Sequence, residues 1–425
     1  MAEGINRISV KGFKSLAEKC SVEVRPLTIL AGANSSGKSS MMQPLLMMKQ
    51  TLEASYDPGA LLLDGPNARF TSADQFLSRS QDRMGAKFSI ALERNDSTSF
   101  NAVFVNDPQA GMEIAEIAYK EEKGVGVLRP NMTREEIIAA FPSRSRIFEK
   151  QYALKIERDR CFLEIKYILD ESGDVYSITG FSKAYVKDIL SLIHVPALRG
   201  NPERNYKKTT VGPRFPGTFE IYAASLISHW QATDDSRIND LENALELLGL
   251  TWKVRSKKVD DVSVEVMVGR LPHKSQSIPE DLVSIADVGF GISQTLPVIV
   301  ALLAAEPGQL VYVEQPEIHL HPRAQTAMAQ ILADAANRGV KVVVETHSSL
   351  LLLGIQSLVA EGKLSSERVK LHWFKRRPED GVTEVVSADL DKSGAFGDWP
   401  EDFSSAEMDA DIRYIHAAEA RLEPD

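Results

Sequence analysis

Apolar and polar positions follow different periods in different parts of the 425-residue chain. Between residues 5 and 31 they alternate and end in the compact run LTIL, which predicts short strands. From Ser39 to about Leu52, methionines and leucines recur at steps of three and four residues. That spacing predicts a helix directly after the last of these strands.

The middle of the chain has a more mixed pattern. Alternation typical of half-buried antiparallel strands is clearest in FSIAL (88–92), LEIKYIL (163–169) and VYSI (175–178). Helices are expected over 183–193 and about 218–249, and strands near 252–256 and 262–268.

From residue 281 onward, strands and helices alternate. The buried run LVYVE precedes a helix that begins at Pro322 and is closed by Gly339, and VKVVVETH is the next buried strand. This order predicts an α/β fold with a parallel or mixed sheet. We expect one head domain split into 1–54 and 281–376, an inserted α+β region over 55–280, and a C-terminal extension over 377–425.

Composition narrows the class of protein. Hydrophobic residues at 43% and charged residues at 25% are typical of a soluble globular protein. A formal charge of -10 argues against binding nucleic acid or a membrane through overall charge. The polar start and the lack of an apolar run near the roughly 20 residues of a membrane span predict a cytoplasmic protein with no membrane partner.

The segment GANSSGKS fits the phosphate-binding pattern G-x-x-x-x-G-K-S, and it lies between a predicted strand and a predicted helix. Its glycines let backbone N–H groups face phosphate oxygens, Lys38 supplies charge for the β and γ phosphates, and the Ser39 hydroxyl ligates Mg²⁺. The predicted nucleotide-binding residues here are Gly32, Asn34, Ser35, Ser36, Gly37, Lys38, Ser39 and Ser40.

Three later segments supply what such a loop needs. Glu314, at the end of LVYVE, is expected to hold Mg²⁺ through water, together with Ser39. His347 ends the next buried strand, where its ring could sense a γ-phosphate. Gly291 and Ser293 open an apolar helix and predict a second anion site, which would cover the nucleotide of a twin molecule.

Taken in order, these motifs resemble the ABC-type ATPases of the RecF/SMC and OLD-like group. The likeness is greatest to bacterial stand-alone AAA-family ATPases whose acidic motif reads E-[QN]-P-E-x-H-L-H-P. It extends to KGFKSL (11–16), HVPALRGNPERNY (194–206) and the segments DGVTEV and GDWPEDF near 381–403, and it leaves out about 80–180.

The resemblance implies an ABC-type head that forms a homodimer or higher oligomer around two ATP molecules. Each ATP would lie between Gly32–Ser39 of one subunit and Gly291–Ser293 of the other, and the loop from His319 to Pro322 would cross the dimer. In most ABC enzymes a glutamate follows the acidic metal-holding residue and polarises the attacking water, but here that position is Gln315. Glu317 is the candidate substitute base, so we expect slow or conditional hydrolysis. The predicted catalytic set is Glu314, Gln315, Glu317 and His347.

Three functions remain open at this point. The first is an ATP-dependent switch that regulates a partner effector, as relatives do in antiphage defence. The second is a RecF-like ATPase that binds DNA through the basic clusters 144–150, 155–160, 199–208 and 253–258. The third is a scaffold that holds ATP without hydrolysing it, which Gln315 would suit. Arg199 could reach the nucleotide or dimer interface, or could form a structural ion pair.

Overall fold

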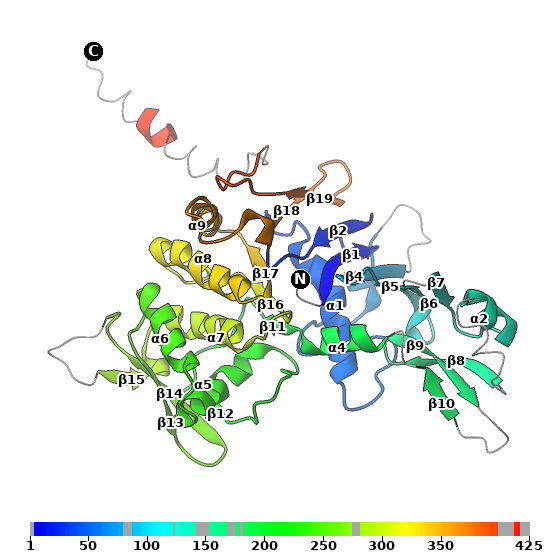
Figure 1. Ribbon diagram of the computed structural model, residues 1–425, viewed down its shortest axis with the longest axis horizontal. Helices are drawn as coiled ribbons and strands as arrows, with labels where there is room; N and C mark the ends of the chain where they lie inside the picture. The colour runs from blue at the N-terminus through cyan, green and yellow to red at the C-terminus, as the bar shows by residue number, and fades with distance from the viewer. Residues whose placement is uncertain are drawn as a thin grey trace.

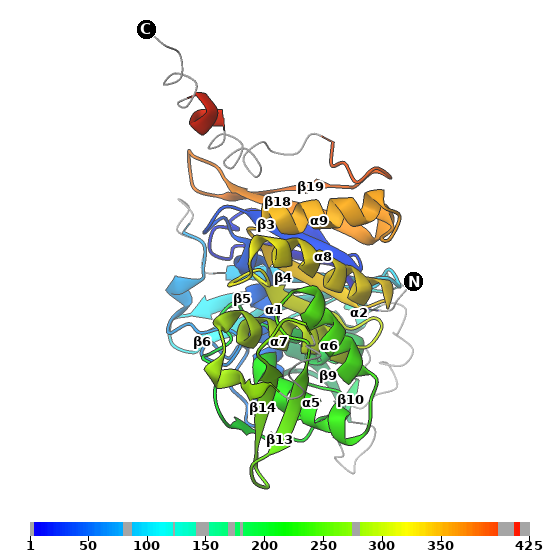
Figure 2. The ribbon, with the colours of Figure 1, turned by 90° about the vertical axis from the view of Figure 1, so that its left-hand side faces the viewer.

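The computed structural model (Figures 1 and 2) describes residues 4–79, 87–121, 124–141, 153–168, 175–178, 182–273, 281–397 and 412–416. Its central sheet has the strand order β11-β16-β17-β3-β18-β19 and is parallel except for the last pair. The strands are β11 (Ile193–Val195), β16 (Leu310–Glu314), β17 (Lys341–Thr346), β3 (Leu27–Gly32), β18 (Val369–Arg376) and β19 (Thr383–Ala388).

Helices cover both faces of this sheet. Leu27 and Ile29 of β3 pack in one core with helices α7 (Phe290–Ala304), α8 (Pro322–Asn337) and α9 (Ser349–Ala360). Leu30 faces the other way and packs in a second core with α1 (Lys38–Glu53). Helices α8 and α9 run side by side (Figures 1 and 2). The predicted α/β fold with a mainly parallel sheet is therefore confirmed.

An antiparallel sheet of order β2-β1-β4-β5-β6-β7 lies beyond α1 and shares its core. Its strands are β1 (Ile5–Lys11), β2 (Cys20–Glu23), β4 (Lys87–Arg94), β5 (Ser99–Asp107), β6 (Gly111–Glu121) and β7 (Gly124–Leu128). The sequence pattern missed β5 to β7. Next to this sheet lie α2 (Arg134–Ala140), α4 (Lys183–Ser191) and the small sheet of β8 (Ala153–Asp159), β9 (Phe162–Ile168) and β10 (Val175–Ile178).

The rest of the inserted region forms a second lobe. Strands β12 (Tyr206–Lys207), β13 (Val254–Lys258), β14 (Ser263–Gly269) and β15 (Leu282–Ser284) pack with the helices α5 (Ala223–Ala232) and α6 (Arg237–Leu247). The predicted helix over 218–249 is thus divided into the 3-10 turn Phe219–Tyr222, α5 and α6. The break falls at Asp234, whose φ of 51° is outside the right-handed helical region.

The sheets cross the predicted domain boundaries. Strand β11 comes from the expected insert and β19 from the expected C-terminal extension, yet both belong to the central sheet. Strand β1 pairs with β4, although the boundary at residue 54 would separate them. A short helix over 412–416 follows at the C-terminal end. Across the described residues, no helix is both long enough and apolar enough to cross a membrane.

Phe100 ties the antiparallel sheet to its neighbours, because its fully buried ring lies 5.2 Å from the ring of Phe162 and 5.4 Å from that of Tyr185. We expect Phe100→Ala to lower the free energy of unfolding by about 3–5 kcal/mol through lost burial and a cavity. Urea denaturation followed by circular dichroism measures the change. The control is Val125→Ala on β7, where the side chain is 60% exposed. Equal effects of the two substitutions would contradict this account of the core.

Candidate nucleotide site

The loop between β3 and α1 has a left-handed backbone at several positions, which favours small residues, and glycine above all. Gly32, Ser35 and Gly37 have φ values of 142°, 60° and 109°. A Cβ atom on Gly32 would lie 2.2 Å from the carbonyl oxygen of Phe374, and one on Gly37 would lie 2.7 Å from Thr383 Oγ1. The two glycines of the predicted motif are therefore required by left-handed backbone and by close contacts with β18 and β19.

Lys38 is buried at the first position of α1, with 3% of its surface exposed. Its Nζ donates to the carbonyl oxygens of Gly32 (3.0 Å) and Ala33 (2.9 Å), and burial lowers its pKa. The first turn of α1 has no acidic residue and no side-chain cap. Free N–H groups at a helix start and a buried ammonium together favour an anion at this point.

A hollow of ≈ 490 Å³ opens above the loop, a size suited to a small-molecule ligand. Its lining consists of Lys14, Asn34, Ser35, Ser36, Gly37, Lys38, Ser39, Ser40, Gln43, Gln315, Glu345, His347 and Arg376. The structure thus brings Asn34–Ser40 together with the predicted Gln315 and His347. The predicted Glu314, Glu317, Gly291 and Ser293 do not line this hollow.

Glu345 is the carboxylate that lines the hollow in the described part of the chain, and the sequence analysis did not select it. Its Oε1 accepts a hydrogen bond from Ser39 Oγ (3.0 Å), and its Oε2 accepts one from the Tyr312 hydroxyl (2.9 Å). Burial, and then repulsion from Glu314, raise the pKa of Glu345. The available signal was period-two alternation along β17, which puts residue 345 on the face of Val343 that packs towards α1.

Glu314 is paired with Glu345 across β16 and β17, but its carboxylate is held elsewhere. Its Oε1 lies 3.1 Å from His194 Nε2, and its Oε2 accepts the N–H of Ala197 (3.3 Å). Burial acts to raise the pKa of Glu314, but its contacts with His194, the Ala197 N–H and the charge of Arg199 together outweigh burial, so the pKa is lowered. Its predicted part in holding Mg²⁺ stays a prediction.

Glu317 fixes the end of β17. Its Oε1 accepts hydrogen bonds from Thr346 Oγ1 (2.7 Å) and from the N–H of His347 (2.8 Å), while its Oε2 is buried without a partner. The Glu317 carboxylate therefore positions His347. The role of Glu317 as a base stays a prediction. Partial burial and the charge of Lys38 lower the pKa of His347, so its ring is neutral at neutral pH.

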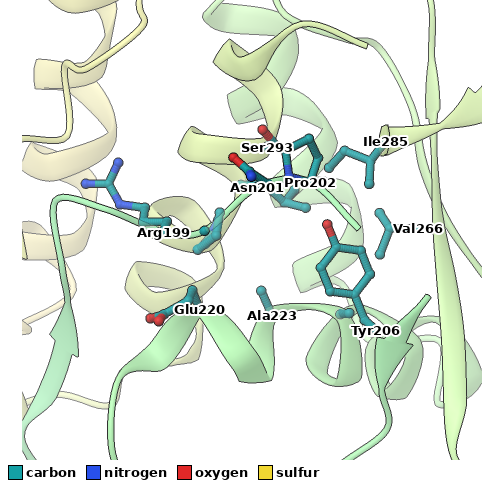
Figure 3. Close-up of a pocket in the computed structure, with 13 residues that line it drawn as sticks. Arg199, Asn201, Pro202, Tyr206, Glu220, Ala223, Val266, Ile285 and Ser293 are labelled. Carbon is teal, nitrogen blue, oxygen red and sulfur yellow. The ribbon is translucent and has the colours of Figure 1, made fainter. Parts of the chain in front are cut away.

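Arg199 is buried, with 6% of its surface exposed (Figure 3), and it contacts both α7 and the end of β16. Its guanidinium donates to the carbonyl oxygens of Gln294 (3.1 Å), Glu314 (2.5 Å) and Gln315 (3.3 Å). The Gln294 side chain in turn donates to the Gly200 carbonyl (2.7 Å). The sequence left open a contact of Arg199 with the nucleotide, a contact with the dimer interface, or a structural ion pair. Within one subunit, the Arg199 guanidinium acts as a clamp on three main-chain carbonyls, and its contact with a nucleotide or a second subunit stays a prediction.

The start of α7 does not face the hollow of its own subunit. Ser293 is buried, lines a separate cavity of ≈ 30 Å³ with Arg199 and Glu220, and donates its hydroxyl to the Phe290 carbonyl (3.1 Å) (Figure 3). The Phe290 side chain is 50% exposed, beside the exposed His319. The anion site at Gly291 and Ser293, and the crossing loop from His319 to Pro322, stay predictions.

Two further cations line the hollow, and the sequence analysis did not select either as a site residue. Lys14 Nζ donates to Gln43 Oε1 (2.7 Å) and lies 4.8 Å from the ring centre of Phe70. Arg376 ends β18 at the rim. Lys14 has a φ of 48°, a local strain that no spacing rule reveals.

Several side chains of the basic clusters considered for DNA binding form ion pairs where they are described. Ion pairs join Arg158 to Asp57, Arg204 to Asp287, Lys253 and Arg255 to Glu242, Lys257 to Glu265, and Lys258 to Asp261. The cluster 144–150 lies outside the described residues. Lys207 and Lys208 of the cluster 199–208 are exposed and form no ion pair in the described part of the chain, so the DNA-binding alternative stays open.

Among solved structures, the chain is similar to Smc head domains. An Smc head bound to the C-terminal winged-helix domain of ScpA is 14% identical, with 92% of this chain and 98% of that chain covered and a TM-score of 0.45. The head domain from Thermotoga maritima is 10% identical, with 91% and 99% covered and a TM-score of 0.39. One from Pyrococcus furiosus, with an extended coiled coil, is 12% identical, with 97% and 100% covered and a TM-score of 0.43.

Two family models match the sequence itself. The model described as "AAA ATPase domain" matches residues 4–190, and the model described as "AAA domain, putative AbiEii toxin, Type IV TA system" matches residues 233–353. No curated protein matches the chain. The first segment contains the phosphate loop, and the second contains α7, Glu314 and His347. The chain is therefore similar to AAA-type ATPase domains over both matched segments.

Proposed function

We propose that this protein binds ATP with Mg²⁺, closes as a homodimer around two ATP molecules, and uses that closure to regulate a separate effector protein in antiphage defence. The observation that carries the proposal is the buried ammonium of Lys38, aimed at its own loop carbonyls at the start of α1. A triphosphate would supply the anion that this cation and the helix start favour.

Dimer closure is supported by the distribution of the motif residues. Lys38, Gln315 and His347 line one hollow, whereas Ser293 and Gly291 lie outside it. A second subunit would be needed to bring the start of α7 to the nucleotide. The exposed Phe290 and His319 at that end of the molecule suit a contact made only on closure.

Slow hydrolysis is supported by the chemistry of Gln315 and Glu317, the two polar side chains that follow β16. The amide of Gln315 lines the hollow but cannot accept a proton as a carboxylate does. The Oε1 atom of Glu317 already accepts hydrogen bonds from Thr346 and His347, so only its Oε2 is left to act as a base. Regulation of an effector is supported by the family resemblance and by the toxin–antitoxin wording of the matching family model.

Lys38→Ala should reduce ATP affinity at least about 100-fold, because it removes the buried cation of the phosphate site. Isothermal titration calorimetry measures the affinity. The control is Lys392→Ala, which removes an exposed lysine outside the hollow and should leave ATP affinity unchanged. Full ATP affinity in the Lys38 variant would reject the proposed site.

Ser293→Arg should leave ATP binding to the monomer intact and abolish ATP-dependent dimer formation. The ≈ 30 Å³ cavity beside Ser293 cannot hold an arginine side chain, which would therefore project into the expected interface. Sedimentation velocity with and without ATP distinguishes the two species. Ser357→Arg on α9 is the control. Ser357 also donates its hydroxyl to a carbonyl of its own helix, that of Leu353, but it is exposed and lies outside the expected interface. Equal dimerisation of both variants would count against the sandwich.

Affinity purification from the native host, with wild-type and Lys38→Ala protein, tests the regulatory role. We expect one effector protein to be retained in an ATP-dependent manner. Salt-sensitive DNA binding without a protein partner would favour the RecF-like alternative instead. Retained ATP without phosphate release under all conditions would favour the scaffold.

A further inference from the structure

The acidic side of the hollow differs from what motif order implies. Two glutamates end adjacent parallel strands, Glu314 on β16 and Glu345 on β17, and register pairs them directly. Only the second lines the hollow in the described part of the chain. Because β17 lies between β16 and β3, it is also the strand next to the phosphate loop.

Glu345 is bound to the residue expected to ligate the metal. Ser39 Oγ donates to its Oε1 at 3.0 Å, whereas the carboxylate of Glu314 contacts His194 and the Ala197 N–H and not Ser39. The Tyr312 hydroxyl holds Glu345 Oε2 and so fixes the carboxylate in place. Only 5% of the surface of Glu345 is exposed, and hydrogen bonds hold both of its carboxylate oxygens.

The donor set fits Mg²⁺. A serine hydroxyl and a carboxylate, both oxygen donors, meet at the entry to α1, and Mg²⁺ in nucleotide sites is held by one or two such groups together with phosphate oxygens and water. A second carboxylate on the adjacent strand adds negative charge close by. A dication there would offset the repulsion between Glu314 and Glu345.

We propose that Glu345, rather than Glu314, is the carboxylate that holds Mg²⁺ at the nucleotide site, by accepting the hydrogen bond of the metal-ligating Ser39 hydroxyl and facing the metal's water shell. Glu314 supports it through charge and through its contact with His194 on β11. This inference rests on the proposed binding of ATP. It assigns the metal-holding role to a residue that sequence analysis did not select.

The test compares metal dependence in Glu345→Gln and Glu314→Gln. ATP affinity is measured by calorimetry in EDTA and in saturating Mg²⁺, and Mn²⁺ binding to the ATP-saturated protein is titrated by electron paramagnetic resonance. For Glu345→Gln we expect ATP affinity in EDTA to be at least as high as in wild type, because a carboxylate beside the phosphates is removed. We expect about 10–100-fold weaker Mn²⁺ binding, as is usual when a group that orients a metal ligand is lost. Glu314→Gln should weaken Mn²⁺ binding less than about threefold.

Two controls keep the outcome interpretable. Glu242→Gln changes a buried glutamate that pairs with Lys253 and Arg255 in the second lobe, and it should leave Mn²⁺ binding unchanged. Glu345→Asp keeps the charge but withdraws it from Ser39, so it should weaken Mn²⁺ binding even if Glu345→Gln fails to fold. A larger loss in Glu314→Gln than in both Glu345 variants overturns the inference. Absence of ATP binding by wild-type protein in EDTA and in Mg²⁺ would instead reject the proposed function.

Discussion

A buried ammonium that forms no ion pair with a carboxylate of the described residues organises the proposed nucleotide site. Lys38 is almost fully buried, and its hydrogen bonds in the described structure go to two loop carbonyls, which are partial and not full negative charges. Burial of a cation disfavours its charged form unless an anion compensates. The glycines that curl the loop, the uncapped start of α1 and the neutral ring of His347 all leave room for such an anion.

The order of strands in the central sheet decides which acidic residue meets the loop. Along the chain, Glu314 comes first and lies in the more conspicuous motif. In space, β17 lies between β16 and β3, so Glu345 is adjacent to the loop and Glu314 is one strand further away. Both side chains lie on the α1 face, because they share the alternation of Tyr312 and Val343. Sequence period predicts the face of each residue but does not predict the neighbour of each strand.

This distinction separates what the sequence could predict from what it could not. Local patterns predict the phosphate loop and four of the elements around it, namely α1, β16, α8 and β17. In each of them an apolar run meets a glycine or proline at one end. The antiparallel sheet depends on pairing between β1 and β4, which are far apart in the chain. Nothing local in residues 5–11 indicates that partner. Likewise, Arg199 has an ordinary basic context, and only the approach of α7 to β16 turns it into a carbonyl clamp.

The Arg199 clamp joins the two motifs that the proposed dimer closure would have to coordinate. Arg199 binds Gln294 on α7 and the carbonyls of Glu314 and Gln315, and the Gln315 N–H donates to the Glu345 carbonyl (2.7 Å). The Gln315 backbone is therefore held from both sides in a left-handed conformation, with a φ of 45°. A conformation of this kind persists only where surrounding contacts determine it. Displacement of α7 by a second subunit would act on those contacts, and so on the side chain that faces the nucleotide hollow.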